Sequence, residues 1–171
     1  MSLNLDISTA TVDDLPVILK FIEDLAEYER MRDGCVATVE KLRATLFAER
    51  PAAEVIIARL DGEPVGFALF FHNYSTFLAQ RGIFLEDFFV KPEGRGKGVG
   101  RALLAELARI AIERDCGRIE WVVLDWNDLA IGFYKSIGAK PVDGWMNFRL
   151  TGEQLLALAS EQPESPGTTG R

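Results

Sequence analysis

Hydrophobic and polar residues recur along this chain at two different spacings, which together predict a mixed α/β protein. Apolar and polar residues alternate from Leu3 to Ile7, the pattern of a short half-buried strand. From Leu15 to Ala26 apolar residues recur every three or four positions, which predicts an amphipathic helix entered through Thr11. A second helix is expected from Thr38.

Later segments continue both patterns. Five of them are expected to be strands: Glu54 to Leu60, Val65 to Tyr74, Ile83 to Val90, Arg118 to Leu124 and Trp145 to Leu150. Three are expected to be helices: Val99 to Asp115, Asp128 to Ile137 and Thr151 to Ala159. Because no internal repeat or long linker divides the chain, we expect one domain over residues 1–160 and a disordered tail over residues 161–171.

Charge and composition narrow the classes of function. The net charge of -7 disfavours a nucleic-acid partner, because binding to a phosphate backbone normally requires a basic face. The same charge favours small cationic ligands, although many acidic proteins carry it for solubility alone. No apolar run reaches the ~20 residues of a membrane span, and the first residues lack a signal-type core, so a cytoplasmic protein without a membrane partner is expected.

The chain leaves its strand LEDFFV through a turn rich in glycine. Three cations lie among four glycines in this turn: Gly94, Arg95, Gly96, Lys97, Gly98, Gly100 and Arg101. Such a backbone allows close approach by a ligand, and the following helix terminus favours an anion, so the segment is suited to a pyrophosphate. A P-loop is excluded because Gly98 follows Lys97, and the dinucleotide fingerprint fails in every register. The spacing that does match is Arg-x-x-Gly-x-Gly, beginning at Arg95.

This motif resembles the acetyl-CoA motif of the GNAT superfamily of N-acetyltransferases. A second signature agrees, in LDWNDLAIGFYKSIGAK, and the segments FIEDLAEYERM, FHNYSTF and GWMNFRL are similar to the spermidine/spermine and thialysine N-acetyltransferases. The resemblance runs from about Leu3 to Ala159. It implies an α/β (α+β) fold with a twisted, mostly antiparallel sheet, whose central strands near Val90 and Leu124 splay apart. It also implies acetyl-CoA as co-substrate, no metal, a small cationic amine as acceptor and a homodimer.

The resemblance also implies roles for individual residues. Those expected to bind acetyl-CoA are Phe88, Phe89, Val90, Arg95, Gly96, Lys97, Gly98, Val99, Gly100, Arg101, Asn127, Asp128, Leu129, Ala130 and Tyr134. Those expected to bind the acceptor are Tyr28, Glu29, Glu86, Asp87, Glu120, Trp121, Asp143 and Trp145. Tyr134 is the expected general acid for the leaving thiolate. Glu86 is the candidate general base, because an ionisable side chain in an otherwise apolar strand is energetically costly without a function or a partner. An equal alternative is that Glu86 binds the substrate cation.

The acceptor remains open at this stage. Where the polyamine-acetylating relatives carry an acidic residue and a tryptophan, this chain has Ser75 and Phe77, which resembles the thialysine type. A polyamine or diamine, a lysine-like amino acid, and a CoA-binding sensor without turnover are therefore three hypotheses. Cys116 is not expected to be a nucleophile, because no histidine accompanies it, and His72 is not expected to be catalytic.

Overall fold

A computed structural model describes residues 4–161 of the protein. The strands are β1 (Leu5–Thr9), β2 (Glu54–Leu60), β3 (Glu63–Ser75), β4 (Gln80–Val90) and β5 (Ile119–Trp121). The α-helices are α1 (Leu15–Tyr28), α2 (Val39–Leu46), α3 (Val99–Glu113), α4 (Asp128–Ser136) and α5 (Gly152–Ser160), and short 3-10 turns lie at Val12–Asp14, Arg32–Gly34 and Pro92–Gly94. The chain forms two compact units, the first ending at Leu124 and the second beginning at Asp125.

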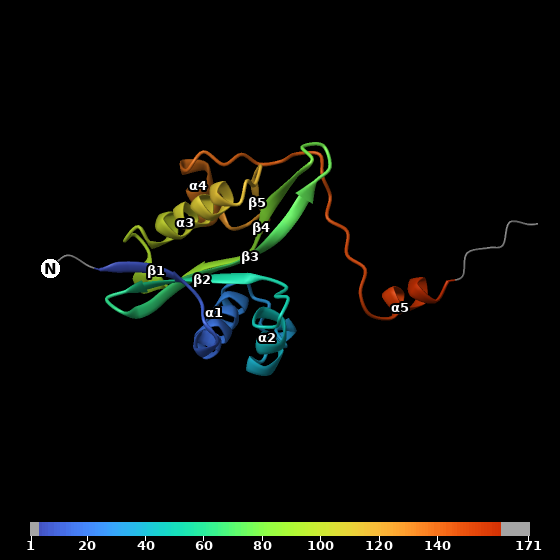
Figure 1. The fold of residues 1–171 in the computed structure, drawn as a ribbon, viewed down its shortest axis with the longest axis horizontal. Coiled ribbons are helices and arrows are strands. Elements are labelled where there is room, and N and C mark those ends of the chain that lie inside the picture. Colours follow the sequence, from blue (N-terminus) through green and yellow to red (C-terminus); the bar gives the residue numbers. More distant parts are fainter. Residues whose placement is uncertain (1–3, 162–171) are drawn as a thin grey trace, which may run out of the picture. The chain divides into compact units, whose positions relative to one another are not determined.

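The sheet of the first unit is mostly antiparallel, which confirms the predicted fold class. Its strands follow the order β1-β2-β3-β4-β5, and each pair is antiparallel except β4 with β5. Helices α1 and α2 cover one face of the sheet and α3 covers the other (Figure 1). We call these the α1 face and the α3 face.

Side chains along each strand point alternately to the two faces of the sheet, so each face receives a layer of hydrophobic side chains. On the α1 face, Phe21 stacks on Phe67 with ring centroids 5.1 Å apart, and Phe89 meets Phe21 edge-on. The core cluster on this face also contains Leu69 of β3. On the α3 face, Phe70 contacts the guanidinium of Arg114, just beyond α3. Because neighbours in a strand point to opposite faces, these contacts assign a face to every residue of β3.

A β-bulge interrupts the ladder between β3 and β4. Leu69 is paired with Asp87 and Phe70 with Leu85, so Glu86 is the extra residue of β4. Bulges of this kind redirect side chains and are frequent beside active sites. Glu86 is exposed at this point, whereas Leu85 is buried.

The pairing between β4 and β5 is short. It covers only Ile83 to Leu85 on β4 and Ile119 to Trp121 on β5, and then stops at the bulge. The predicted strand from Arg118 to Leu124 is therefore wrong in its length, because residues 122–124 have no strand structure. Loss of pairing beyond Leu85 agrees with the expected separation of the two central strands.

A cluster of polar side chains joins β2, β3 and the end of α3 on the α3 face. Arg114 donates to Glu54 Oε1 at 2.5 Å and to Glu54 Oε2 at 2.8 Å, and its Nη1 also lies 3.0 Å from His72 Nε2. Since a guanidinium only donates, His72 Nε2 accepts and Nδ1 carries the proton, which it donates to Gly82 O at 3.1 Å. Cys116 Sγ lies 3.8 Å from His72 Nδ1.

This cluster corrects the expectation that no histidine accompanies Cys116. The two residues are far apart in the sequence, so only the fold brings them together. His72 Nδ1 is a donor to the backbone here and does not act as a base toward the thiol. Cys116 and His72 therefore stay outside the candidate site, for a different reason from the one that the sequence suggested.

In the second unit, the strand predicted from Trp145 to Leu150 is also wrong. Residues 141–150 contain one turn, no strand, and only exposed side chains. A strand needs a neighbour to which its N–H and C=O groups can bond, and residues 145–150 pair with no strand in the part of the chain that the structure describes. The predicted tail falls, apart from Glu161, outside the described residues, and the single domain over residues 1–160 stays a prediction.

Candidate functional site

The loop between β4 and α3 is shaped to face a ligand. Gly96 and Gly98 adopt positive φ angles of 71° and 80°, in the left-handed region that favours glycine. A Cβ atom at either position would meet nothing within 4 Å, so the space in front of both residues is open. Gly98 is the N-cap of α3 and has no side chain that could accept hydrogen bonds from the first-turn amides. These amides belong to Val99, Gly100 and Arg101.

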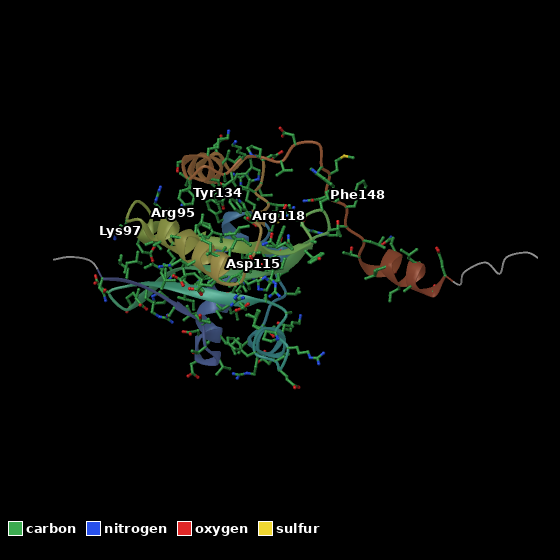
Figure 2. The ribbon with its side chains drawn as sticks, turned by 45° about the horizontal axis from the view of Figure 1, so that its top comes forward. Arg95, Lys97, Asp115, Arg118, Tyr134 and Phe148 are labelled. Atoms are coloured by element: carbon green, nitrogen blue, oxygen red, sulfur yellow. The ribbon has the colours of Figure 1, made fainter. Side chains whose placement is uncertain are left out.

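Charge reinforces this geometry. Arg95 and Lys97 lie at the start of α3 (Figure 2), and Arg101 follows in its first turn. Lys97 and Arg101 are exposed, whereas the side chain of Val99 is buried, so only the backbone of Val99 is available to a ligand. The residues expected to hold a pyrophosphate thus form one cationic loop at a helix N-terminus, which fits a diphosphate group.

The last part of β4 directs half of its backbone groups away from β3. Lys91 N donates to Val65 O of β3 at 2.9 Å, so in an antiparallel pair the groups of Val90 point to the opposite side, as do those of Phe88. This is the side on which β5 has already separated. Phe89 instead pairs with Phe67 and contributes its ring to the core, so Phe88 and Val90 fit a backbone-binding role better than Phe89.

Arg95 closes over this edge of β4. Its Nε donates to Val90 O at 3.0 Å, and its guanidinium lies 5.2 Å from the ring centroid of Tyr28 and 6.0 Å from that of Phe89. An open hollow between α1 and the β4–α3 connection is lined by residues that include these three. Tyr28, which the sequence assigns to the acceptor site, therefore contacts a residue assigned to the cofactor.

Two carboxylates meet at the end of α1. Glu29 caps α1, and Asp87 lies on the α1 face because its register partner Leu69 belongs to that core. Burial raises the pKa of Asp87 to about 6, and the negative charges of Glu86 and Glu29 add to this effect. Burial also raises the pKa of Glu29. Glu29, Glu86 and Asp87 thus form one acidic group, in which burial and the neighbouring negative charges favour the protonated form of Asp87.

Glu120 lies further along the same face. Its Oε2 accepts from Asn73 Nδ2 at 2.8 Å, and it forms an ion pair with Arg118 Nε at 2.8 Å. Asn73 is on the α1 face because it is four residues beyond Leu69. Trp121 follows Glu120 directly and so points to the other face, which separates it from the remaining acceptor residues of this unit.

Sequence reasoning missed Arg118 and Asn73. The signal that could have found them is Gly82, a glycine in the middle of an otherwise regular strand pattern, which often marks a close approach by another group. A Cβ atom at Gly82 would lie 2.4 Å from Asn73 Oδ1 and 3.3 Å from Arg118 Cγ.

The second unit carries the remaining predicted residues. Asn127 is the N-cap of α4, and its Oδ1 accepts from Ala130 N at 3.2 Å, so its side chain has a structural role in starting the helix. Tyr134 is half-buried on α4, where its ring lies 5.6 Å from that of Phe133. Asp143 and Trp145 are exposed in residues 141–150, while Asp128 and Leu129 begin α4 with exposed side chains.

Two structural findings concern other classes of site. Within residues 4–161, no group of three or more His, Cys, Asp or Glu side chains is arranged to hold a metal ion. None of the helices in this range has both the length and the hydropathy that crossing a membrane requires.

Comparison with known proteins finds a matching family model and similar N-acetyltransferases. The model of the acetyltransferase (GNAT) family matches residues 20–139. The thialysine N-epsilon-acetyltransferase of Sus scrofa is 38% identical over 166 residues, covering 91% of this chain and 97% of that protein. The L-ornithine N5-acetyltransferase of Arabidopsis thaliana is 34% identical, covering 89% and 86%.

Solved structures agree on the fold. An integron cassette protein from the mobile metagenome of V. cholerae superposes with a TM-score of 0.77 at 29% identity, covering 94% of this chain and all of that one. A metagenomic aminoglycoside acetyltransferase superposes with a TM-score of 0.74 over 87% of this chain, at 19% identity.

Proposed function

The chain belongs to the acetyltransferase (GNAT) family, and on that premise we propose that it acetylates a primary amine of a small cationic acceptor by direct attack in a ternary complex with acetyl-CoA. Acetyl-CoA is the co-substrate of this family. The observation that carries the proposal is the cationic glycine loop at the start of α3, placed directly after the edge of β4 from which β5 has separated. Relatives that acetylate thialysine and ornithine support the choice of a small amine.

The residues of the first unit bind and align. When bound, acetyl-CoA supplies an activated acetyl thioester. The first-turn amides of α3, with Gly96, Lys97 and Gly98, bind the pyrophosphate, and the backbone of Phe88 and Val90 binds the pantetheine arm. Arg95 must leave the carbonyl of Val90 for that arm to bond there, after which its guanidinium is available to the phosphates.

Proton transfer requires two further groups. The acceptor arrives as an ammonium ion, because alkyl amines have pKa values near ~10, so a carboxylate must take its proton before attack. Glu86 and Asp87 are the candidates; the raised pKa of Asp87 supports Asp87 as the base, and the exposed position of Glu86 supports binding of the incoming cation. Tyr134 is proposed to protonate the leaving thiolate, and Asn127 to Ala130 to line the cofactor channel.

We also propose that the protein is a cytoplasmic homodimer. Support for a dimer comes from large apolar side chains that are exposed in the second unit, among them Trp145 at 79% and Phe148 at 89%. Contiguous exposed apolar residues often mark a protein–protein interface. In this proposal, Asp143 and Trp145 contribute to the acceptor site of one subunit or the other.

The test is an acetyl-transfer assay on the full chain. Release of free thiol from acetyl-CoA is followed with lysine, thialysine, ornithine, putrescine and spermidine, and the acetylated product is identified by mass spectrometry. Transfer to any of these amines supports the proposal. Tight binding of acetyl-CoA without transfer to any amine would contradict it and favour a sensor that binds CoA without turnover.

A further inference from the structure

We propose that Arg95 couples the binding of acetyl-CoA to that of the acceptor, because its guanidinium occupies a cation site formed by the rings of Tyr28 and Phe89. Arg95 leaves this site when acetyl-CoA binds, and the ammonium group of the acceptor takes its place. The inference rests on the proposed function and deepens it, since it adds a subsite for the acceptor and an energetic link between the two substrates. The resemblance implied a cofactor role for Arg95 and an acceptor role for Tyr28, but no contact between them.

The guanidinium of Arg95 makes one hydrogen bond and two aromatic contacts. Its Nε donates to Val90 O at 3.0 Å, and its Cζ lies 5.2 Å from the ring centroid of Tyr28 and 6.0 Å from that of Phe89. Both ring distances fall within the reach of about 6 Å for a cation–π contact. The side chain of Arg95 is exposed, so these contacts are weak and the guanidinium can be exchanged for another cation.

The two rings lie in a region that attracts ammonium groups. Phe89 is on the same face of β4 as Asp87, two residues or about 7 Å along the strand, and Tyr28 ends the helix that covers this face. Aromatic faces beside carboxylates suit an alkyl ammonium ion. A neighbouring ring already holds such a group from the chain itself, since Lys91 Nζ lies 5.3 Å from the ring centroid of Phe21.

The open hollow between α1 and the β4–α3 connection gives a small amine access to the two rings. Its volume is about 470 Å³, within the range of small-molecule sites, and both rings contribute to its lining. Three carboxylates and three cationic side chains also line it: Asp24, Glu27, Glu93, Lys20, Lys91 and Arg95. Departure of Arg95 therefore leaves one negative charge in excess, which the ammonium group of the acceptor balances.

The hydrogen bond between Arg95 and Val90 links this site to the cofactor. Val90 O points to the side on which β5 has separated, where the pantetheine arm bonds in the proposed function. Arg95 donates to this same oxygen, so it must move for the arm to bond there. Because Arg95 directly precedes Gly96 of the glycine loop, a phosphate oxygen offers it a charge-assisted hydrogen bond instead. The movement takes its guanidinium away from both rings.

Calorimetric titration of the full chain measures this link without turnover. CoA replaces acetyl-CoA, because it fills the cofactor site but has no acetyl group to transfer, and thialysine is the amine. We expect the wild type to bind thialysine about three- to tenfold more tightly with saturating CoA than without it, the order of effect of a cation–π contact at an exposed site. Arg95→Gln should bind thialysine equally tightly with and without CoA, near the wild-type affinity with CoA.

Tyr28 supplies a second pair of variants. Tyr28→Phe keeps the ring and should preserve the coupling, whereas Tyr28→Leu removes the ring and should abolish it. Loss of the coupling in Tyr28→Phe would assign it to the hydroxyl group and overturn the inference.

Lys97→Gln is the matched control, because it removes one positive charge from the same loop. It should weaken CoA binding and leave the thialysine affinity measured without CoA at the wild-type value, and thermal melting checks that each variant folds. If Arg95→Gln also weakens CoA binding and keeps the coupling, Arg95 serves the phosphates alone; this would overturn the inference and leave the proposed function intact. Absence of both thialysine binding to the CoA complex and acetyl transfer to any amine would overturn both.

Discussion

At the scale of single residues, adjacent carboxylates in this protein have different environments. Glu86 is the extra residue of a β-bulge and faces solvent, whereas Asp87 is directed into the α1 face beside Glu29. One position along the strand thus changes a solvated carboxylate into one that is still partly protonated near neutral pH. Sequence alone assigned both to the site but could not divide their roles, because the bulge that separates them leaves no mark in the pattern LEDFFV.

The division of roles predicts different pH profiles. In the wild type, kcat/KM for the amine should rise with pH through about 6 as Asp87 loses its proton and becomes a base. Asp87→Asn should lose this rise together with most of the activity, by about 10²-fold or more. Glu86→Gln should keep the rise but move it to lower pH, because the negative charge of Glu86 contributes to the raised pKa of Asp87, and it should show a higher KM for the amine. Loss of the rise in Glu86→Gln, with the rise retained in Asp87→Asn, would assign the base to Glu86.

The same carboxylate should affect stability. Its pKa is higher in the folded protein than the ordinary value of 3.8, so the folded state binds the proton more tightly between pH 4 and 6. The free energy of unfolding therefore falls as the pH rises through this window and stays lower above it. We expect Asp87→Asn to raise the free energy of unfolding by about 2 kcal/mol at pH 7.5 and by little at pH 4. Urea unfolding at both values measures the difference.

Tyr134 carries a separate prediction. Tyr134→Phe removes only the hydroxyl group, so acetyl-CoA affinity should be unchanged while kcat falls about 10²-fold, the range for loss of a general acid. Isothermal titration and single-turnover kinetics separate the two quantities. Turnover equal to that of the wild type would reject Tyr134 as the essential acid.

At the scale of elements, the junction of β4 with α3 combines two requirements in one short loop. At the end of β4, the backbone N–H and C=O groups that point away from β3 must be free to bind a ligand. At the start of α3, the first backbone amides must not be covered by a side chain. Gly98 meets the second requirement through its left-handed conformation and the open space beside it.

Substitution of Gly98, compared with a control glycine, should distinguish an effect on acetyl-CoA binding from an effect of backbone strain on stability. Gly98→Ala forces a side chain into a positive φ angle, which costs about 1 kcal/mol of stability, and also places a methyl group where the phosphates would bind. We expect the KM for acetyl-CoA to rise about tenfold or more. Gly138→Ala is the matched control, because Gly138 also has a positive φ and open space but lies outside the glycine loop. It should lower stability by a similar amount without changing that KM.

Most elements could be predicted from the sequence, and the errors share one cause. Helix α1 and the hairpin of β2 and β3 follow from local periodicity and from the Asp61-Gly62 turn, which adopts positive φ angles at both residues. The end of β5 at Trp121 and the absence of a strand at residues 145–150 could not be predicted, because both depend on whether a partner strand is present. Arg118 was not predicted for the same reason. It contacts Glu120, and Glu120 is held by Asn73, which lies on another strand far away in the sequence.

At the scale of the whole molecule, the two units differ in how they use apolar residues. The first unit buries Phe21, Phe67, Phe70 and Phe89 around the sheet and exposes Tyr74 and Phe77 near the β3–β4 turn, whereas residues 141–150 of the second unit expose every apolar side chain. Such exposure is costly for an isolated chain and is usually relieved by association.

The proposed dimer can be tested through this segment. Phe148, at 89% exposure, is expected to lie at the subunit interface, so Phe148→Asp should shift the protein toward monomer. Sedimentation velocity over a wide range of protein concentrations measures the change. Lys140→Asp alters the charge of a nearby exposed residue without removing apolar area and serves as the control. A wild-type protein that stays monomeric at every concentration would contradict the proposal.

The polar cluster on the α3 face has a practical consequence. His72 is the single histidine of the chain, and its Nδ1–H donates to the carbonyl oxygen of Gly82. On the opposite face of the sheet, the missing side chain of Gly82 leaves room for Arg118. The imidazole resonances of His72 would thus stand alone in an NMR spectrum, without assignment by mutagenesis. A ligand that binds beside Gly82 should shift those resonances, so a titration followed at His72 can detect binding there without a label.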